Sequence, residues 1–252
     1  MKHAAPSTLQ VYRRNVYSQN GEDGVIAELI RRLGIGLDWF CEFGAWDGRY
    51  GSNCYSLLKA GWSGVMIEGE PARFRVLERL ARRFPHRLHA IEAYVDDEPG
   101  NERSLDTLLT ATRIPRDFAV LSIDIDSFDY QVWSSVSAFR PRIVVIEIES
   151  SIPPGREQVH DGRRHQMTSF SSMLALGRAK RYTLACHTGN MIFVRDEDVA
   201  RLDLPREELA RPESLFVSDW VHPTRLAKWR RKLHFMTPQR AWVKAVNVLH
   251  GT

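Results

Sequence analysis

The chain has little of what marks secreted, zinc-binding or membrane proteins. It contains three cysteines in 252 residues, and they show no CxxC or Cys/His ligand spacing. This argues against a disulfide framework and a zinc site, and it favours buried free thiols. The longest apolar runs, such as residues 143–146, are far too short to cross a bilayer, and the start of the sequence lacks an apolar signal segment. We therefore expect a soluble, cytoplasmic protein without a membrane span.

The sequence also lacks a Gly/Ser/Pro-rich linker, an internal repeat and a low-complexity segment. With 43% hydrophobic residues, it is long enough for one large domain with a terminal extension. The formal charge of +4 is mild, and cations between residues 225 and 232 supply much of it. An apolar stripe in the same stretch favours packing on the domain, or on a second copy in a homo-oligomer, over nucleic-acid binding. We expect an N-terminal segment and helix (1–36), a core domain (37–200) and a basic helical extension (201–252).

Apolar runs of strand length alternate with segments of helical periodicity from residue 22 to about residue 150. Continuous apolar strands separated by helices predict a parallel sheet covered on both faces. Residues 151–166 are aperiodic, and we interpret them as a mobile lid. Residues 182–186 and 191–194 flank a turn and predict a β-hairpin. The strands of the parallel part are expected near residues 39–43, 64–67, 88–95, 118–123 and 143–146.

Two of the predicted strands end in an acidic residue that could bind the ribose of a nucleoside. Glu42 is followed by a turn bracketed by Gly44 and Gly48, and Glu68 ends the next strand. An acid at the end of a strand in an α/β sheet can accept both ribose hydroxyls of a bound nucleoside. The pattern therefore predicts an adenosine-containing cofactor, with Gly44 allowing a close approach of the backbone.

A second group of acids lies at the ends of two later strands. Asp124 and Asp126 end one strand, and Glu147 ends the next. Neighbouring parallel strands bring their carboxyl ends together, so these side chains are expected to converge where ligands bind in open α/β sheets. Crowded carboxylates repel unless a proton or a hard cation such as Mg²⁺ lies between them. A second interpretation is that Asp126 and Asp129 cap the following helix.

Four segments together carry a family resemblance. They are residues 17–23 (YSQNGED), 42–48 (EFGAWDG), 122–126 (SIDID) and 190–195 (NMIFVR). This set resembles the FkbM-like S-adenosylmethionine-dependent methyltransferases. The resemblance implies a class I methyltransferase (Rossmann-like) fold, which is an α/β fold with a mostly parallel seven-stranded sheet, helices on both faces and a C-terminal β-hairpin. It implies S-adenosylmethionine as cofactor, held by Gln19, Glu42, Gly44, Asp47, Glu68 and Asp124. Gln19 and Asp47 equally suit the capping of local turns.

Members of this family mostly methylate hydroxyls of sugars or secondary metabolites, so the resemblance points to O-methyl transfer. We expect a small-molecule or oligosaccharide acceptor, with transfer to a hydroxyl of a sugar, glycan or polysaccharide precursor. A sugar hydroxyl is a weak acid, so such an enzyme needs a general base or a Lewis-acidic metal. The candidate bases are Asp126 and His165, with His160 and His187 as further histidines near the acceptor, and the candidate Mg²⁺ ligands are Asp124, Asp126 and Glu147.

Three alternatives stay open from the sequence. One is O-methylation of an aromatic or macrolide-type secondary metabolite. Another is RNA binding or RNA modification by the basic extension, although the Asn/Asp-Pro-Pro-aromatic motif of amino-group methylation is absent. The last is a noncatalytic scaffold that retains the fold.

Overall fold

A computed structural model describes residues 7–162 and 167–221. The chain divides into two units, Met1–Val217 and Ser218–Thr252. Of the second unit, the described part is the short 3₁₀ helix η4 (Ser218–Trp220) and Val221. The basic part of the predicted extension lies outside the described residues. The first unit holds the sheet, the N-terminal segment and residues 201–217, and it contains every site discussed below.

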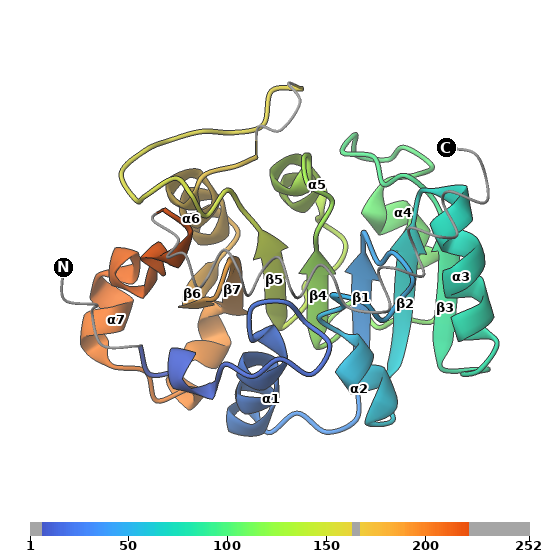
Figure 1. The fold of residues 1–252 in the computed structure, drawn as a ribbon, viewed down its shortest axis with the longest axis horizontal. Helices are drawn as coiled ribbons and strands as arrows, with labels where there is room; N and C mark the ends of the chain where they lie inside the picture. Colours follow the sequence, from blue (N-terminus) through green and yellow to red (C-terminus); the bar gives the residue numbers. More distant parts are fainter. Residues whose placement is uncertain (1–6, 163–166, 222–252) are drawn as a thin grey trace. The chain divides into compact units, whose positions relative to one another are not determined.

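The first unit is built on a seven-stranded sheet in the order β3-β2-β1-β4-β5-β7-β6 (Figure 1). The pairs from β3 to β5 are parallel, and β7 runs antiparallel to both of its neighbours. This strand order with a closing antiparallel hairpin is the class I methyltransferase fold, as predicted. The strands are β1 (Trp39–Phe43), β2 (Ser63–Glu68), β3 (Leu88–Glu92), β4 (Val120–Ile123), β5 (Ile143–Glu147), β6 (Tyr182–His187) and β7 (Asn190–Arg195).

Helices cover both faces of the sheet. Side chains alternate along each strand, so Phe40 faces one apolar cluster and Phe43 the other. The cluster that contains Phe40 is completed by α1 (Glu22–Leu33), α2 (Tyr55–Lys59) and α3 (Pro71–Ala81). The cluster that contains Phe43 is completed by α4 (Leu105–Thr110), α5 (Asp129–Ser135) and α6 (Phe170–Ala179). The remaining helices are α7 (Arg206–Ala210) and the 3₁₀ helices η1 (Gln10–Tyr12), η2 (Asp196–Arg201) and η3 (Pro212–Leu215).

Local sequence signals fixed several of these boundaries. Gly34 ends α1 with φ 64°, and its N–H bonds the carbonyls of Ile30 and Arg31. Pro71 opens α3 at a position where its missing N–H costs nothing. The third strand is shorter than predicted: β3 ends at Glu92, because the chain then leaves the sheet toward a bridge between Asp96 and Ser104.

All three cysteines are buried, and none forms a disulfide. Among the described helices, none combines the length and the apolar composition that a bilayer crossing needs.

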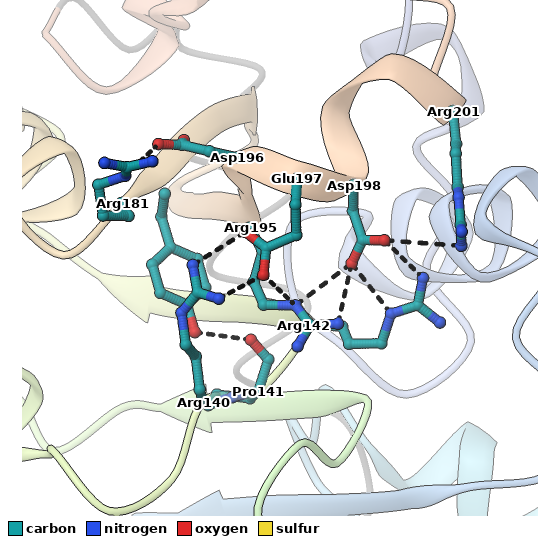
Figure 2. Close-up of polar contacts among 10 residues, drawn as sticks. Arg140, Pro141, Arg142, Arg181, Arg195, Asp196, Glu197, Asp198 and Arg201 are labelled. Atoms are coloured by element: carbon teal, nitrogen blue, oxygen red, sulfur yellow. Dashed lines mark hydrogen bonds and ion pairs between the residues drawn. The ribbon is translucent and has the colours of Figure 1, made fainter.

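Ion pairs close the edge of the sheet where β5 begins and β7 ends (Figure 2). Arg142 donates two hydrogen bonds to Asp198, at 2.8 and 3.0 Å, and Arg195 also contacts Asp198. Burial opposes ionisation of Asp198, but these two arginines hold its pKa below the ordinary value. Because the candidate residues lie at the opposite, carboxyl-terminal edge of the strands, this network is a structural support and not a part of the site.

Candidate functional site

The turn after β1 is held between the ends of β2 and β4. Gly44 has φ 72°, and a Cβ on it would lie 1.7 Å from the carbonyl oxygen of Asp124. On the other side, Ala45 N–H donates to the carbonyl of Ile67 at 3.1 Å, and Trp46 N–H donates to Oε2 of Glu68 at 2.8 Å. The glycine thus lets the turn touch the backbone of β4 while its next residues bind β2. The two groups of predicted acids lie on either side of this one turn.

Glu68 is buried but keeps hydrogen-bonding capacity. Its Oε2 accepts the N–H of Trp46 and its Oε1 accepts the N–H of Glu70, both at 2.8 Å. A carboxylate offers about four acceptor positions, so lone pairs on both oxygens stay available for two hydroxyl donors. Glu68 is therefore an oriented acid at the end of β2, and its contact with a ribose stays a prediction.

Tyr94 is a neighbour of Glu68 that the sequence analysis missed. A Cβ on Gly69 would lie 2.4 Å from Cδ1 of Tyr94, so the tyrosine ring rests on the backbone next to Glu68. The side chain is 64% exposed, which leaves a large part of the ring uncovered. A single aromatic just after the third strand is the signal that identifies it. An uncovered aromatic ring beside an acid that is predicted to bind a ribose suits the stacking of a nucleobase.

Glu42 has protein partners for both of its oxygens. Ser52 Oγ donates to Oε2 at 2.5 Å, and Asn53 N–H donates to Oε1 at 2.7 Å. Burial raises the pKa of Glu42 to about 7, against the effect of these two hydrogen bonds, and the charge of Asp23 adds to the rise. Glu42 holds the loop that precedes α2, and its role toward a cofactor stays a prediction.

The raised pKa of Glu42 predicts that stability falls as pH rises. The folded state binds this proton more tightly than the unfolded chain, whose carboxyl has its ordinary pKa of 4.5, so the stabilisation present at low pH is lost as pH rises through about 7. We expect the melting temperature to fall between about pH 5 and about pH 8, and the slope to be smaller in Glu42→Gln, which keeps an acceptor for Asn53. An identical slope in the variant contradicts this assignment.

Asp47 and Gln19 both lie at the loop after β1. Asp47 Oδ1 accepts the N–H groups of Arg49 and Tyr50, at 2.9 and 2.8 Å, so it caps the local turn. Gln19 is exposed, and its Nε2 lies 2.9 Å from where a Cβ on Gly51 would be. The amide of Gln19 therefore covers Gly51. Contact of either side chain with the cofactor stays a prediction.

Asp124, Asp126 and Glu147 come together as predicted from the strand ends. One ligand atom from each lies within 4.8 Å of the others. Glu147 Oε2 is buried and has no hydrogen-bond partner among the described residues. An orphaned carboxylate oxygen next to two further carboxylates is an arrangement that a hard divalent cation with oxygen ligands fits.

Asp129 shapes the segment that presents Asp126. Its two carboxylate oxygens accept the N–H groups of Ile125 and Ser127, both at 3.0 Å, and Asp126 has φ 60° in the turn between them. The cap position of α5 is Phe128, which provides no side-chain hydrogen bond. The interpretation that Asp126 and Asp129 cap α5 is therefore wrong, because the cap residue is Phe128 and the carboxylate of Asp129 binds the preceding loop.

The acid cluster, formed by Asp124, Asp126 and Glu147, holds protons in the absence of a cation. Burial and the negative charges of Asp129 and Asp126 raise the pKa of Asp124 to about 8, against the effect of a hydrogen bond with Glu147. Burial and the charge of Asp124 place the pKa of Glu147 well above its ordinary value. At neutral pH these carboxyls thus share protons, and a divalent cation that binds them must displace those protons.

The three histidines named as possible bases have different positions. His165 lies outside the described residues. His187 is buried, with Nδ1 accepting Val217 N–H at 2.9 Å and Nε2 lying 2.9 Å from Ser150 Oγ. Burial, with the charge of Arg13, lowers the pKa of His187 to about 3, so this histidine is neutral and structural. His160 is buried and packs against Phe128, with ring centroids 4.5 Å apart. Phe128 lies two residues after Asp126 in the sequence.

Comparisons with known proteins found similar solved structures. No family model and no curated protein matches the sequence. Magnesium protoporphyrin IX methyltransferase (ChlM) from Synechocystis PCC 6803 with bound SAH matches at 12% identity and a TM-score of 0.46, over 77% of this chain and 90% of its own. A putative caffeoyl-CoA O-methyltransferase from Staphylococcus aureus matches at 14% identity and a TM-score of 0.48, over 74% and 91%. The cyclase SpnF matches at 13% identity and a TM-score of 0.43, over 72% and 75%. At these identities the likeness concerns the fold alone, since one fold hosts many reactions.

Proposed function

We propose that this protein is an S-adenosylmethionine-dependent O-methyltransferase that acts on a hydroxyl of a sugar, glycan or polysaccharide precursor. The observation that carries the proposal is the turn at Gly44, which touches the end of β4 and binds Glu68 through Trp46 N–H. One side of this turn offers a ribose-type acid with an uncovered aromatic ring. The other side offers a cluster of carboxylates. A nucleoside cofactor and a hydroxyl acceptor suit these two sides.

On the cofactor side, the residues of this chain bind the cofactor and orient it. Glu68 accepts the ribose hydroxyls, and Tyr94 stacks on the base. When bound, S-adenosylmethionine supplies an activated methyl group, so the protein needs to align the acceptor oxygen and manage one proton. The fixed turn at residues 44–48 keeps the cofactor-side groups at a constant distance from the acid cluster.

On the acceptor side, the acid cluster handles the hydroxyl proton. Asp126 is exposed, whereas Asp124 and Glu147 are half-buried, so it is the carboxylate that an acceptor reaches first. Asp124, Asp126 and Glu147 would hold Mg²⁺, which would supply Lewis acidity to the acceptor hydroxyl. Without the cation, Asp126 accepts the proton as a general base.

A polyhydroxylated acceptor suits this edge better than an aromatic or macrolide one. Three converging carboxylates, one with an orphaned buried oxygen, offer several acceptor positions to a row of hydroxyl groups. Phe128, 42% exposed and two residues from Asp126, offers an apolar surface to the face of a ring. Radiolabel transfer from S-adenosylmethionine to nucleotide sugars, catechols and RNA, in parallel, separates the three acceptor classes. Transfer to RNA or catechols alone contradicts the sugar assignment.

Binding of the product S-adenosylhomocysteine (SAH) tests the proposal without knowledge of the acceptor. Glu68→Ala is expected to weaken SAH binding in calorimetric titration by about 1.5–3 kcal/mol, because hydrogen bonds between hydroxyls and a charged group are lost. Glu92→Ala is a matched control, since Glu92 is the exposed register partner of Glu68 at the end of β3. Wild-type protein that does not bind SAH ends the proposal, and equal affinity of the Glu68 and Glu92 variants removes Glu68 from the site.

A further inference from the structure

Two side chains clamp the N-terminal segment to the turn between β6 and β7. Glu22 is buried, and its carboxylate accepts Thr188 Oγ1–H at 2.7 Å and Asn20 N–H at 2.8 Å. Arg13 donates to the carbonyls of the same two residues, at 2.9 Å to Asn20 and 3.3 Å to Thr188. Asn20 and Thr188 are therefore each held by one anion and one cation, although they are far apart in the sequence.

The clamp continues into a compact loop at residues 16–20. Asp23 Oδ2 accepts the N–H groups of all three of residues 16–18, at 2.7 to 3.0 Å. Three donors on one carboxylate oxygen fix the backbone of this loop. Asp23 follows Glu22 directly. The residue that binds Thr188 and the residue that holds the loop therefore both lie in the first turn of α1.

The loop at residues 16–20 lies on the cofactor side of the site. The ring of Tyr17 packs edge-on against Tyr55, with centroids 4.6 Å apart. The amide of Gln19 covers Gly51 in the loop between the Gly44 turn and α2. The next residues of that loop, Ser52 and Asn53, are the partners of Glu42.

The turn between β6 and β7 is itself rigid. Ser150 Oγ donates to the carbonyl of Gly189 at 2.6 Å and lies 2.9 Å from Nε2 of His187. Gln10 Nε2 donates to the carbonyl of His187 at 3.1 Å. These bonds hold Thr188 in place, and Glu22 and Arg13 connect the 16–20 loop to it.

We propose that Glu22 and Thr188 are positioning residues for the cofactor site, acting through Gln19. They do not touch the cofactor. They hold the 16–20 loop so that the Gln19 amide stays over the loop that follows the Gly44 turn, where it closes the cofactor site. This inference rests on the proposed function, and it adds two residues to it.

Thr188→Val removes the hydroxyl at nearly constant volume and leaves Oε1 of Glu22 without its donor, while Oε2 keeps the N–H of Asn20. We expect it to weaken SAH binding about tenfold in calorimetric titration, and Thr188→Ser to bind as wild type. Thr183→Val is the matched control, because Thr183 lies on the same hairpin and donates a comparable bond to Asp196 at 2.8 Å, at the far edge of the sheet. Melting temperatures of all variants verify that they are folded. Wild-type affinity in Thr188→Val, or an equal loss in Thr183→Val, overturns the inference.

A double-mutant cycle tests whether the effect passes through Gln19. Gln19→Ala is expected to weaken SAH binding in the wild type but to have little further effect in Thr188→Val, since the amide is then already displaced. Fully additive losses refute this route. Hydrogen exchange of the amides at residues 16–18 provides a readout that needs no ligand: Thr188→Val should speed it and Thr183→Val should not. If the wild type fails to bind SAH, the proposed function is wrong, and unchanged exchange in Thr188→Val separately shows that the clamp does not hold the loop.

Discussion

Gly44→Ala is expected to weaken SAH binding by more than about 100-fold, or about 2.7 kcal/mol. A Cβ 1.7 Å from the carbonyl oxygen of Asp124 is sterically impossible, so the turn or the end of β4 must move. The turn also binds β2, through Ala45 N–H and Trp46 N–H, so its movement takes the partner of Glu68 with it. Calorimetric titration with SAH measures the affinity, and circular dichroism verifies the fold.

Gly34→Ala separates this steric effect from the cost of the backbone conformation. Gly34 has φ 64°, close to the 72° of Gly44, but no atom lies within 4 Å of its Cβ position. Alanine at position 34 therefore costs only the left-handed conformation, about 1 kcal/mol of folding free energy. SAH affinity is expected to stay at the wild-type level. Equal affinities of the two variants contradict the importance of the contact between Gly44 and Asp124.

Much of the fold follows from local signals. The apolar runs before Glu42, Glu68 and Glu147 became buried parallel strands, because such runs can be satisfied only when both faces are covered. Gly34 and Pro71 marked helix ends through their own backbone preferences. The order of the strands needed the resemblance in addition, because periodicity does not specify which strands are neighbours.

The candidate site was predictable only in part. The sequence predicts that acids at strand ends converge, and Asp124, Asp126 and Glu147 do so. It does not predict that Ser52 and Asn53 bind Glu42, because that contact depends on how the loop before α2 folds back. The clamp on Thr188 is still less accessible to sequence analysis, since it joins residues from the two ends of the domain.

Mg²⁺ is expected to stabilise the wild-type protein, and this effect is expected to disappear in Asp124→Asn. At a concentration of 100 times the dissociation constant, a ligand that binds only the folded state adds about 2.7 kcal/mol, which thermal unfolding detects. Burial keeps the pKa of Asp124 at about 8, so binding at neutral pH must release protons. Titrations in buffers of different ionisation enthalpy measure this release. Affinity for Mg²⁺ should therefore rise between about pH 6 and about pH 9.

Glu149→Gln controls for the loss of a nearby negative charge. Glu149 lies two residues after Glu147, the last residue of β5, but its carboxylate accepts the N–H of Ser151 and does not belong to the cluster. This variant should keep the Mg²⁺ response, whereas Glu147→Gln should lose it together with Asp124→Asn. SAH binding should survive in Glu149→Gln and Glu147→Gln, because Glu68 and Tyr94 lie on the other side of the Gly44 turn. A wild-type protein that is not stabilised by Mg²⁺ ends the metal hypothesis. Asp126 is then the base, and its replacement by asparagine is expected to abolish methyl transfer while SAH binding survives.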